Sequence, residues 1–341
     1  MLRSKYLIVL AAACLLMAAV VAGCGNNGPA KGGESGGNGA GGDLQEVMLV
    51  LDWTPNTNHT GLYVARDKGY YEEEGLRVTI QMPGEAGADK MVAAGNAQFG
   101  VSYQEGVTLA RIEGVPIVSI AAVIQHNTSG FAAPEAKGIK SPKDFEGKKY
   151  GGWGSPIEQA TLDLLMEKDH ADASTVETIS IGDADFFTAV KRDIDFAWIF
   201  YAWTGVEAEL RGEPIDMVYL TDYAKELDYY TPVLIANETL IAEQPELVEK
   251  FMRATAKGYQ FAIDQPQEAG ELLAAAEPDL DAELVIASQK WLSPRYQDDA
   301  ARWGEQKLEV WRDYAEWMSR NELLSEAFDP EAAFTNAFLP E

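Results

Sequence analysis

The chain of 341 residues has little cysteine and little histidine: it contains Cys14, Cys24 and three histidines. Both cysteines lie in or beside the N-terminal apolar segment, so the rest of the chain has no thiol. Structural disulfides, CxxC redox chemistry, cysteine nucleophiles and thiolate metal sites are therefore excluded there. The histidines, His59, His126 and His170, do not follow HxxxH or HExxH spacing, so we expect no metal centre.

Positive charge is also scarce. The chain carries 27 Lys and Arg against 54 Asp and Glu, a formal net charge of −27. A nucleic-acid-binding surface is basic, so we expect no nucleic acid as a partner. The same charge opposes adhesion to anionic lipid, so attachment to a membrane would need a covalent lipid. We interpret the acidity as a means of staying soluble outside the cell.

Long apolar runs are confined to the N-terminus, since no later segment approaches the ~18 consecutive apolar residues of a membrane span. The run 6–22 follows Arg3 and Lys5 and ends in small residues before Cys24. This order is typical of a secretory signal peptide, which we expect at residues 1–23. A short membrane helix, or an ordinary signal with an incidental cysteine, is the alternative.

A glycine-rich segment follows the apolar run. Half of residues 25–42 are glycine, and no apolar periodicity interrupts them. Such a segment cannot bury enough surface to offset its ordering entropy. A cysteine between small residues and such a segment resembles the bacterial lipoprotein box, in which the new N-terminal cysteine is acylated. We therefore expect lipidation at Cys24, a flexible tether at 24–42, and a folded body held on the extracytoplasmic face of the cell membrane.

The sequence pattern of the folded body predicts two α/β lobes. It is too long for one simple core, and short apolar strands alternate with helices along most of it, which is typical of βαβ units. The segment 230–236 resembles a chain returning to the first lobe. The predicted elements include a strand at 47–51, a helix at 61–73, a helix at 186–192, a strand at 194–200 and C-terminal helices.

We predict that two crossings join the lobes. The first lobe comprises 43–133 and 231–341, with the C-terminal helices packed on it, and the second comprises 134–230. The C-terminal tryptophans are interpreted mainly as core residues: Trp291, Trp303, Trp311 and Trp317. Ligands of open α/β sheets bind beyond the carboxyl ends of strands, so the loops that follow strands are the candidate site.

The first such loop runs from Asp52 to Gly61 and is dense in hydrogen-bonding side chains. Asn58 offers both donors and acceptors, His59 can do either near neutral pH, and Trp53 offers a flat surface. We name these three as candidate binding residues. The alternative is an Asx-type turn in which Thr60 caps the next helix.

Two further loops follow predicted strands. Gln104 and Glu105 come directly after the strand ending near residue 102, and we expect both in the cleft. A Gly-rich loop at a helix N-terminus contains Gly154 and Ser155, whose backbone N–H groups could hold a polar oxygen. Glu158 either contacts the ligand or complements the helix dipole.

The fourth loop leaves the 194–200 strand and is aromatic, with Trp198 and Tyr201 as candidates for stacking on a flat ring. Across the four loops there are Asp52, Glu105, Glu158 and Asp195 but no Lys or Arg. A free anion would be expected to meet a cation. A planar aminated heterocycle fits better, because a carboxylate can accept an exocyclic N–H and share a proton with the adjacent ring nitrogen.

The sequence resembles the thiamine-precursor branch of the substrate-binding protein superfamily that also includes taurine, sulfonate and nitrate binders. The matching stretches are LDWTPNTNHTGLYVARDKGYYEEEGL (51–76), GWGSPIE (152–158) and YYTPVLIANE (229–238). The resemblance implies a type II periplasmic-binding fold and a monomer without cofactor or catalytic residues.

The resemblance also implies a function. Such proteins bind N-formyl-4-amino-5-aminomethyl-2-methylpyrimidine, a thiamine breakdown product, and pass it to the permease and ATPase subunits of an ABC importer for thiamine salvage. Riboflavin or a sulfonate is the alternative ligand. The same branch contains a eukaryotic pyrimidine synthase that consumes its own histidine, at a position like His59, and carries a CCCFC motif. This chain has no cysteine in the matching region, so we expect a binding protein and not an enzyme.

Overall fold

A computed structural model describes residues 44–182 and 184–341. The predicted signal peptide 1–23, Cys24 and the tether 24–42 lie outside the described residues. Within those ranges, no helix is long and apolar enough to cross a lipid bilayer.

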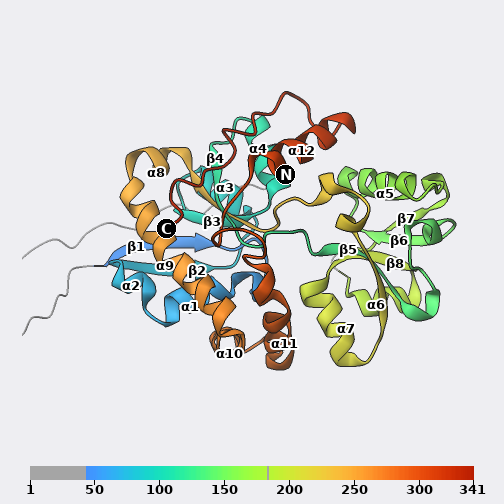
Figure 1. The fold of residues 1–341 in the computed structure, drawn as a ribbon, viewed down its shortest axis with the longest axis horizontal. Coiled ribbons are helices and arrows are strands. Elements are labelled where there is room, and N and C mark those ends of the chain that lie inside the picture. Colours follow the sequence, from blue (N-terminus) through green and yellow to red (C-terminus); the bar gives the residue numbers. More distant parts are fainter. Residues whose placement is uncertain (1–43, 183) are drawn as a thin grey trace, which may run out of the picture. The chain divides into compact units, whose positions relative to one another are not determined.

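The first sheet, sheet A, has the strand order β2-β1-β3-β10-β4. Figure 1 labels its strands β1, β2, β3 and β4. β1 is parallel to β2 and β3, whereas β10 is antiparallel to both of its neighbours, β3 and β4. We call sheet A and the helices packed on it the first lobe. The strands are β1 (Gln45–Val50), β2 (Leu76–Gln81), β3 (Phe99–Ser102), β4 (Ile117–Ala122) and β10 (Val233–Asn237).

Both faces of β1 are buried, which explains the unbroken apolar run at 47–51. Val47 and Leu49 point into the core layer that α1 and α9 cover, whereas Val50 points into the opposite layer with Val92 and Trp311. Side chains of a strand alternate between faces, so a strand covered on both faces must be apolar at every position. The helices along this part of the chain are α1 (Thr60–Asp67), α2 (Tyr70–Glu73), α3 (Gly87–Ala93) and α4 (Gln104–Ile112).

The predicted single helix 61–73 is wrong, because the chain forms the two helices α1 and α2 there. Gly69 separates them with a φ of 76°, in the left-handed region that glycine adopts without steric cost. The break lets α2 turn onto the core, where the buried ring of Tyr71 stacks on Phe251 of α9.

The second sheet, sheet B, repeats this architecture with the order β7-β6-β8-β5-β9, and its antiparallel strand is β5. We call it and its helices the second lobe. The strands are β5 (Ser129–Pro134), β6 (Lys149–Gly152), β7 (Glu177–Ser180), β8 (Phe196–Phe200) and β9 (Ile215–Tyr219), and the helices are α5 (Pro156–Lys168), α6 (Phe186–Arg192) and α7 (Val206–Arg211). The predicted helix at 186–192 is confirmed, and the strand predicted at 194–200 begins two residues late.

Sequence analysis missed strand β5, whose SGFAAP sequence has small residues and a proline in place of a β-branched run. β5 pairs with β8 and β9, so the chain enters the second sheet by Ser129. The first crossing therefore lies ahead of the predicted boundary at 133. The second crossing precedes Val233, the first residue of β10.

The C-terminal helices pack mainly on the first lobe, as predicted. The buried faces of α9, α10 and α11 contribute to the core layer of Val47 and Leu49. α12 departs from the prediction, because Trp311 joins the first lobe whereas Trp317 packs with the core of the second. The helices are α8 (Glu238–Glu243), α9 (Pro245–Asp264), α10 (Pro266–Ala276), α11 (Ala282–Leu292) and α12 (Leu308–Arg320).

Candidate functional site

A cavity of about 350 Å³ lies where the loops after β1, β3, β6 and β8 meet. These are carboxyl ends of strands, where α/β sheets bind ligands. The lining residues come from both lobes and from the second crossing: Asp52, Trp53, Asn56, Thr57, Asn58, Tyr103, Glu105, Trp153, Ile157, Trp198, Phe200, Ala202, Trp203, Tyr229, Thr231 and Pro232.

The first lobe provides the charged groups of the cavity. Asp52 follows β1, and Glu105 lies in the first turn of α4 after β3. Neither Lys, Arg nor His is among the described lining residues. A ligand therefore meets two carboxyl groups and no basic side chain, which favours an N–H donor or a cation over an anion.

The carboxyl group of Glu105 holds its proton unusually well. Burial, followed by the charge of Glu158, raises the pKa of Glu105 from 4.5 to about 7. Both effects disfavour the ionised form. Near neutral pH Glu105 can therefore either donate or accept a hydrogen bond.

The second lobe provides an aromatic wall. Trp153 follows β6, Trp198 lies in β8, and their ring centroids are 5.6 Å apart. Phe200 completes the wall and is 43% exposed, and Trp153 is 53% exposed. The Nε1–H of Trp198 is buried without a hydrogen-bond partner among the described residues. This wall can stack on a flat ring.

Glu158 shapes the loop that carries Trp153. Its carboxylate accepts hydrogen bonds from the backbone N–H groups of Trp153, Gly154 and Ser155 at 2.7–3.1 Å, and from the Tyr150 hydroxyl at 2.5 Å. Ser155 in turn caps α5 in a reciprocal capping box with Glu158. The N–H groups that we expected to hold a ligand oxygen are thus occupied by Glu158, which is itself 2% exposed.

A glycine is required beside this carboxylate. A Cβ added to Gly152 would lie 2.2 Å from Glu158 Oε1 and 2.7 Å from the ring of Tyr150. The Gly-rich loop therefore serves to let the backbone wrap around a buried carboxylate. Its ordered geometry positions the indole of Trp153 at the cavity.

The structure brings together four of the ten predicted binding residues. These are Trp53, Asn58, Glu105 and Trp198, all of which line the cavity. The other predicted residues are not among its lining residues: His59, Gln104, Gly154, Ser155, Glu158 and Tyr201.

Gln104 and Tyr201 lie outside the cavity because other segments bind their polar groups. Gln104 is fully buried, accepts a hydrogen bond from the Tyr230 N–H and donates one to the Val310 carbonyl, so it ties the second crossing to α12. Tyr201 donates to Glu209, and its ring lies 5.1 Å from that of Trp291 on α11.

Tyr201 also starts a single turn of π-helix, Tyr201–Gly205, and no strand continues there. This turn directs Ala202 and Trp203 to the cavity, and π-helical turns frequently occur at functional sites. The predicted stacking residue Tyr201 therefore lies in this turn and does not continue β8.

Several lining residues were not selected from the sequence. Trp153 lies in the Gly-rich loop from which Gly154 and Ser155 are predicted, and Phe200 is the last residue of the aromatic strand β8. Tyr103 is adjacent to Gln104 and Glu105, and 44% of it is exposed. A signal was therefore present, because each one sits at the end of a predicted strand. Tyr229 and Thr231 belong to the crossing and had no such signal.

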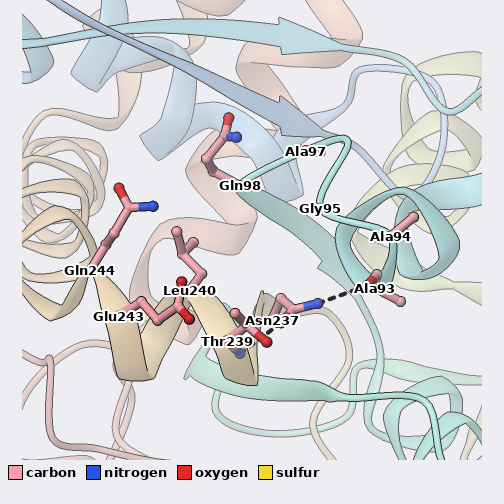
Figure 2. A pocket seen from close by; sticks show the side chains of 10 residues that line it. All are labelled: Ala93, Ala94, Gly95, Ala97, Gln98, Asn237, Thr239, Leu240, Glu243 and Gln244. Carbon is pink, nitrogen blue, oxygen red and sulfur yellow. Dashed lines mark hydrogen bonds between the residues drawn. The ribbon is translucent and has the colours of Figure 1, made fainter.

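Another cavity, of about 310 Å³, lies near the start of β3 and the end of β10, away from the carboxyl ends of β1 and β3 (Figure 2). Its Asn237 donates to the carbonyls of Val92 and Ala93 and accepts from the Thr239 N–H. The polar atoms of Asn237 are thus engaged within the protein, and the described lining of this cavity has no aromatic side chain, unlike that of the cavity between the lobes. Among the described residues, no group of three His, Cys, Asp or Glu side chains could hold a metal ion.

Comparison with curated proteins identifies relatives along most of the chain. A formylaminopyrimidine-binding protein of Halalkalibacterium halodurans is 28% identical over 86% of this chain and 90% of its own. A 4-amino-5-hydroxymethyl-2-methylpyrimidine phosphate synthase of Legionella pneumophila is 28% identical over 86% and 92%. The riboflavin-binding protein RibY of Chloroflexus aurantiacus is 28% identical over 87% of both chains.

Solved structures confirm the fold. The periplasmic aliphatic sulphonate binding protein SsuA of Escherichia coli superposes with a TM-score of 0.67 at 14% sequence identity, over 85% of this chain and 97% of its own. The predicted periplasmic-binding fold with two α/β lobes is therefore correct. The model of the family described as NMT1/THI5 like matches residues 56–269, which is more than half of the chain and includes most of the cavity lining. This protein belongs to the NMT1/THI5-like family.

Proposed function

We propose that this protein is an extracytoplasmic substrate-binding protein that binds N-formyl-4-amino-5-aminomethyl-2-methylpyrimidine and delivers it to an ABC importer for thiamine salvage. The observation that carries the proposal is the opposition of two carboxyl groups, Asp52 and Glu105, to an aromatic wall in a cavity whose described lining has no basic residue. The formylaminopyrimidine-binding relative supports the same ligand.

Glu105 is the proposed partner of the amino edge of the pyrimidine. Its carboxyl group can accept the exocyclic N–H and share one proton with the adjacent ring nitrogen, which gives two parallel hydrogen bonds. The pKa of about 7 supports this role, because the proton is available near neutral pH. Trp198 and Trp153 would stack on the ring, a contact worth roughly 1–3 kcal/mol per aromatic side chain.

Titration calorimetry with the wild-type protein tests the proposal. We expect low-micromolar or tighter binding of the formylaminopyrimidine and weaker or undetectable binding of thiamine, riboflavin and taurine. The control ligand is the same pyrimidine with oxygen in place of the 4-amino group. This change replaces a hydrogen-bond donor at that edge by an acceptor. Equal affinity for the amino and oxo compounds, or binding of taurine alone, would overturn the proposal.

Riboflavin is the second candidate, and one observation favours it. A further cavity of about 340 Å³ on the second lobe shares five aromatic side chains with the first, so a larger ring system has space to extend. The shared residues are Trp53, Trp153, Trp198, Phe200 and Trp203. The riboflavin titration distinguishes the two candidates directly.

A pyrimidine synthase is disfavoured by the environment of the first-loop histidine. His59 is fully enclosed, and the described cavity lining includes no lysine to form an imine with pyridoxal phosphate, the aldehyde that the resembling eukaryotic synthase consumes with its histidine. Incubation with pyridoxal phosphate and iron under air, followed by mass spectrometry of residue 59, tests this alternative. A mass loss at His59 together with release of a pyrimidine would establish the enzyme.

The proposal includes anchoring through a lipid on Cys24. The cysteine after small residues and the glycine-rich segment that follows support it. We expect the full chain to sediment with membranes in a bacterial host and Cys24→Ala to appear in the soluble or secreted fraction. Equal sedimentation of both would contradict the anchor without affecting the ligand assignment.

A further inference from the structure

A histidine is buried directly behind one of the cavity carboxylates. His59 is 0% exposed, and its Nε2 lies 2.7 Å from Asp52 Oδ1. Its Nδ1 accepts a hydrogen bond of 3.2 Å from the backbone N–H of Asn56. Because Nδ1 accepts, the ring proton is on Nε2, and His59 donates it to Asp52.

The local sequence fixes this histidine tightly. Asn56 has an extended backbone, and its Oδ1 accepts from the Asn58 N–H at 2.9 Å while its carbonyl accepts from the His59 N–H at 3.0 Å. From the far side, Tyr259 donates to the Asn58 carbonyl at 2.7 Å. The imidazole is therefore held from both ends, and neither ring nitrogen is available to a ligand.

The hydrogen bond from His59 engages only one of the two carboxylate oxygens of Asp52. The Asp52 side chain is 21% exposed and lines the cavity, with Oδ1 taken by the histidine. Oδ2 forms no hydrogen bond with another described residue. This oxygen lies at the cavity and is open to a hydrogen-bond donor of a ligand.

We propose that His59 is a positioning residue, which orients Asp52 so that the carboxylate receives a second N–H or ammonium group of the ligand, separate from the ring edge at Glu105. This inference rests on the proposed function and adds to it a requirement for two donor groups. The ligand class is an aminopyrimidine with a side-chain amide or amine, and the side-chain N–H belongs at Asp52.

The test compares two ligands across a set of variants. The probes are the formylaminopyrimidine and 4-amino-2,5-dimethylpyrimidine, which keeps the ring edge but lacks the side-chain N–H. The variants are His59→Leu, His59→Gln, Asp52→Asn and the double variant His59→Leu/Asp52→Asn. Tyr71→Phe is the matched control, because it removes a buried hydrogen bond of 2.9 Å to Thr255 in the same lobe, outside the cavity lining.

We expect His59→Leu and Asp52→Asn each to weaken binding of the formylaminopyrimidine about 10-fold or more, as loss of a hydrogen bond to a charged group does. Binding of the shorter probe should change less than about 3-fold. The double variant should lose little more than either single variant, because both remove the same interaction. His59→Gln retains an N–H donor near Nε2 and should recover most of the affinity.

The outcomes separate the two levels of the proposal. If the wild type binds neither probe, the proposed function is wrong. If it binds both but His59→Leu weakens them equally, or the losses in the double variant add, the positioning role is wrong. Tyr71→Phe should lower the Tm and leave both affinities unchanged. Should His59→Leu not fold, the comparison of His59→Gln with Asp52→Asn decides between recovery and loss.

Discussion

The two faces of the cavity differ in chemistry. The first-lobe face carries Asp52, Asn58 and Glu105, which hydrogen-bond, whereas the second-lobe face carries Trp153, Trp198 and Phe200, which stack. Hydrogen bonds select the donor pattern of a ligand, and stacking favours any flat ring. We therefore expect selectivity to come mainly from the first lobe, although Trp53 and Tyr103 also belong to it, and general affinity to come mainly from the second. The two properties should then be separable by substitution.

The local reasons for this difference lie in the strand ends. On the first lobe the chain leaves β1 and β3 into helix-starting turns, where short polar side chains are favoured. On the second lobe Glu158 occupies the loop N–H groups from within, and the residues left facing the cavity are apolar. Buried polar side chains serve structure in both lobes, as Gln104 and Glu158 do, but only the first lobe also places carboxyl groups in the described cavity lining.

The largest effect on affinity is expected from a substitution in the hydrogen-bonding face. Glu105→Leu removes both hydrogen bonds to the amino edge, a loss of about 2–3 kcal/mol or roughly 100-fold in Kd, measured by calorimetry. Glu105→Gln is the matched variant: its amide also offers one acceptor and one donor, so it should retain much of the affinity at neutral pH. Unchanged affinity in Glu105→Leu would show that the ring edge binds elsewhere.

A smaller effect is expected on the stacking face. Trp198→Leu or Trp153→Leu keeps apolar contact but removes the aromatic surface, which should weaken binding by roughly 1–2 kcal/mol, about 5- to 30-fold. The amino and oxo pyrimidines should lose affinity in equal proportion, because stacking does not read the donor pattern. A selective loss of one compound would contradict the division of roles between the lobes.

The pH dependence of binding sharpens the same comparison. In the proposed complex Glu105 and the pyrimidine share one proton, and without ligand the Glu105 carboxyl, whose pKa is about 7, loses its proton as pH rises through that value. Above this pH, binding must take up a proton, so Kd should increase by up to about tenfold per pH unit. The tryptophan variants should keep this slope and Glu105→Gln should lose it. A flat wild-type profile between pH 7 and 9 would exclude the shared proton.

The smallest expected effect concerns the hinge that joins the faces. His126 lies in the first crossing, and a hydrogen bond to Asp228 beside the second crossing, 2.7 Å long, is the main cause that raises its pKa from 6.5 to about 9. The folded state has the higher pKa, so this contribution is complete below pH 6.5 and is lost as pH rises through 9.

His126→Gln should therefore lower the Tm slightly at pH 6 and leave it nearly unchanged at pH 10, as differential scanning calorimetry would show. The effect is modest because the side chain is 43% exposed and solvent screens the pair. An equal difference in Tm at both pH values would show that the charge of His126 makes no contribution.

Residue selection within each loop shows where sequence reasoning failed. Glu105 and Gln104 are neighbours of similar size, yet Gln104 is committed to Tyr230 and Val310, which are 126 and 206 residues away. Asn58 and His59 are also neighbours with different roles: Asn58 lines the cavity, whereas His59 is buried and bonds to Asp52. The order of residues does not contain this information, because the partners of Gln104 come from distant segments and the bond from His59 to Asp52 depends on how the first loop folds.

The sequence by itself determined most of the strands, though not β5, together with the family and the loops that form the site. Apolar runs such as 47–51 predict strands because both faces of a strand inside the sheet must be buried. The site loops are predictable because such folds bind ligands at strand ends. Tertiary structure decided which residue of each loop faces the cavity. It also turned Glu158 and His59 from candidate ligand contacts into supports for Trp153 and Asp52. The physical reason is that a buried polar side chain must satisfy its hydrogen bonds, and only packing determines whether the protein already does so.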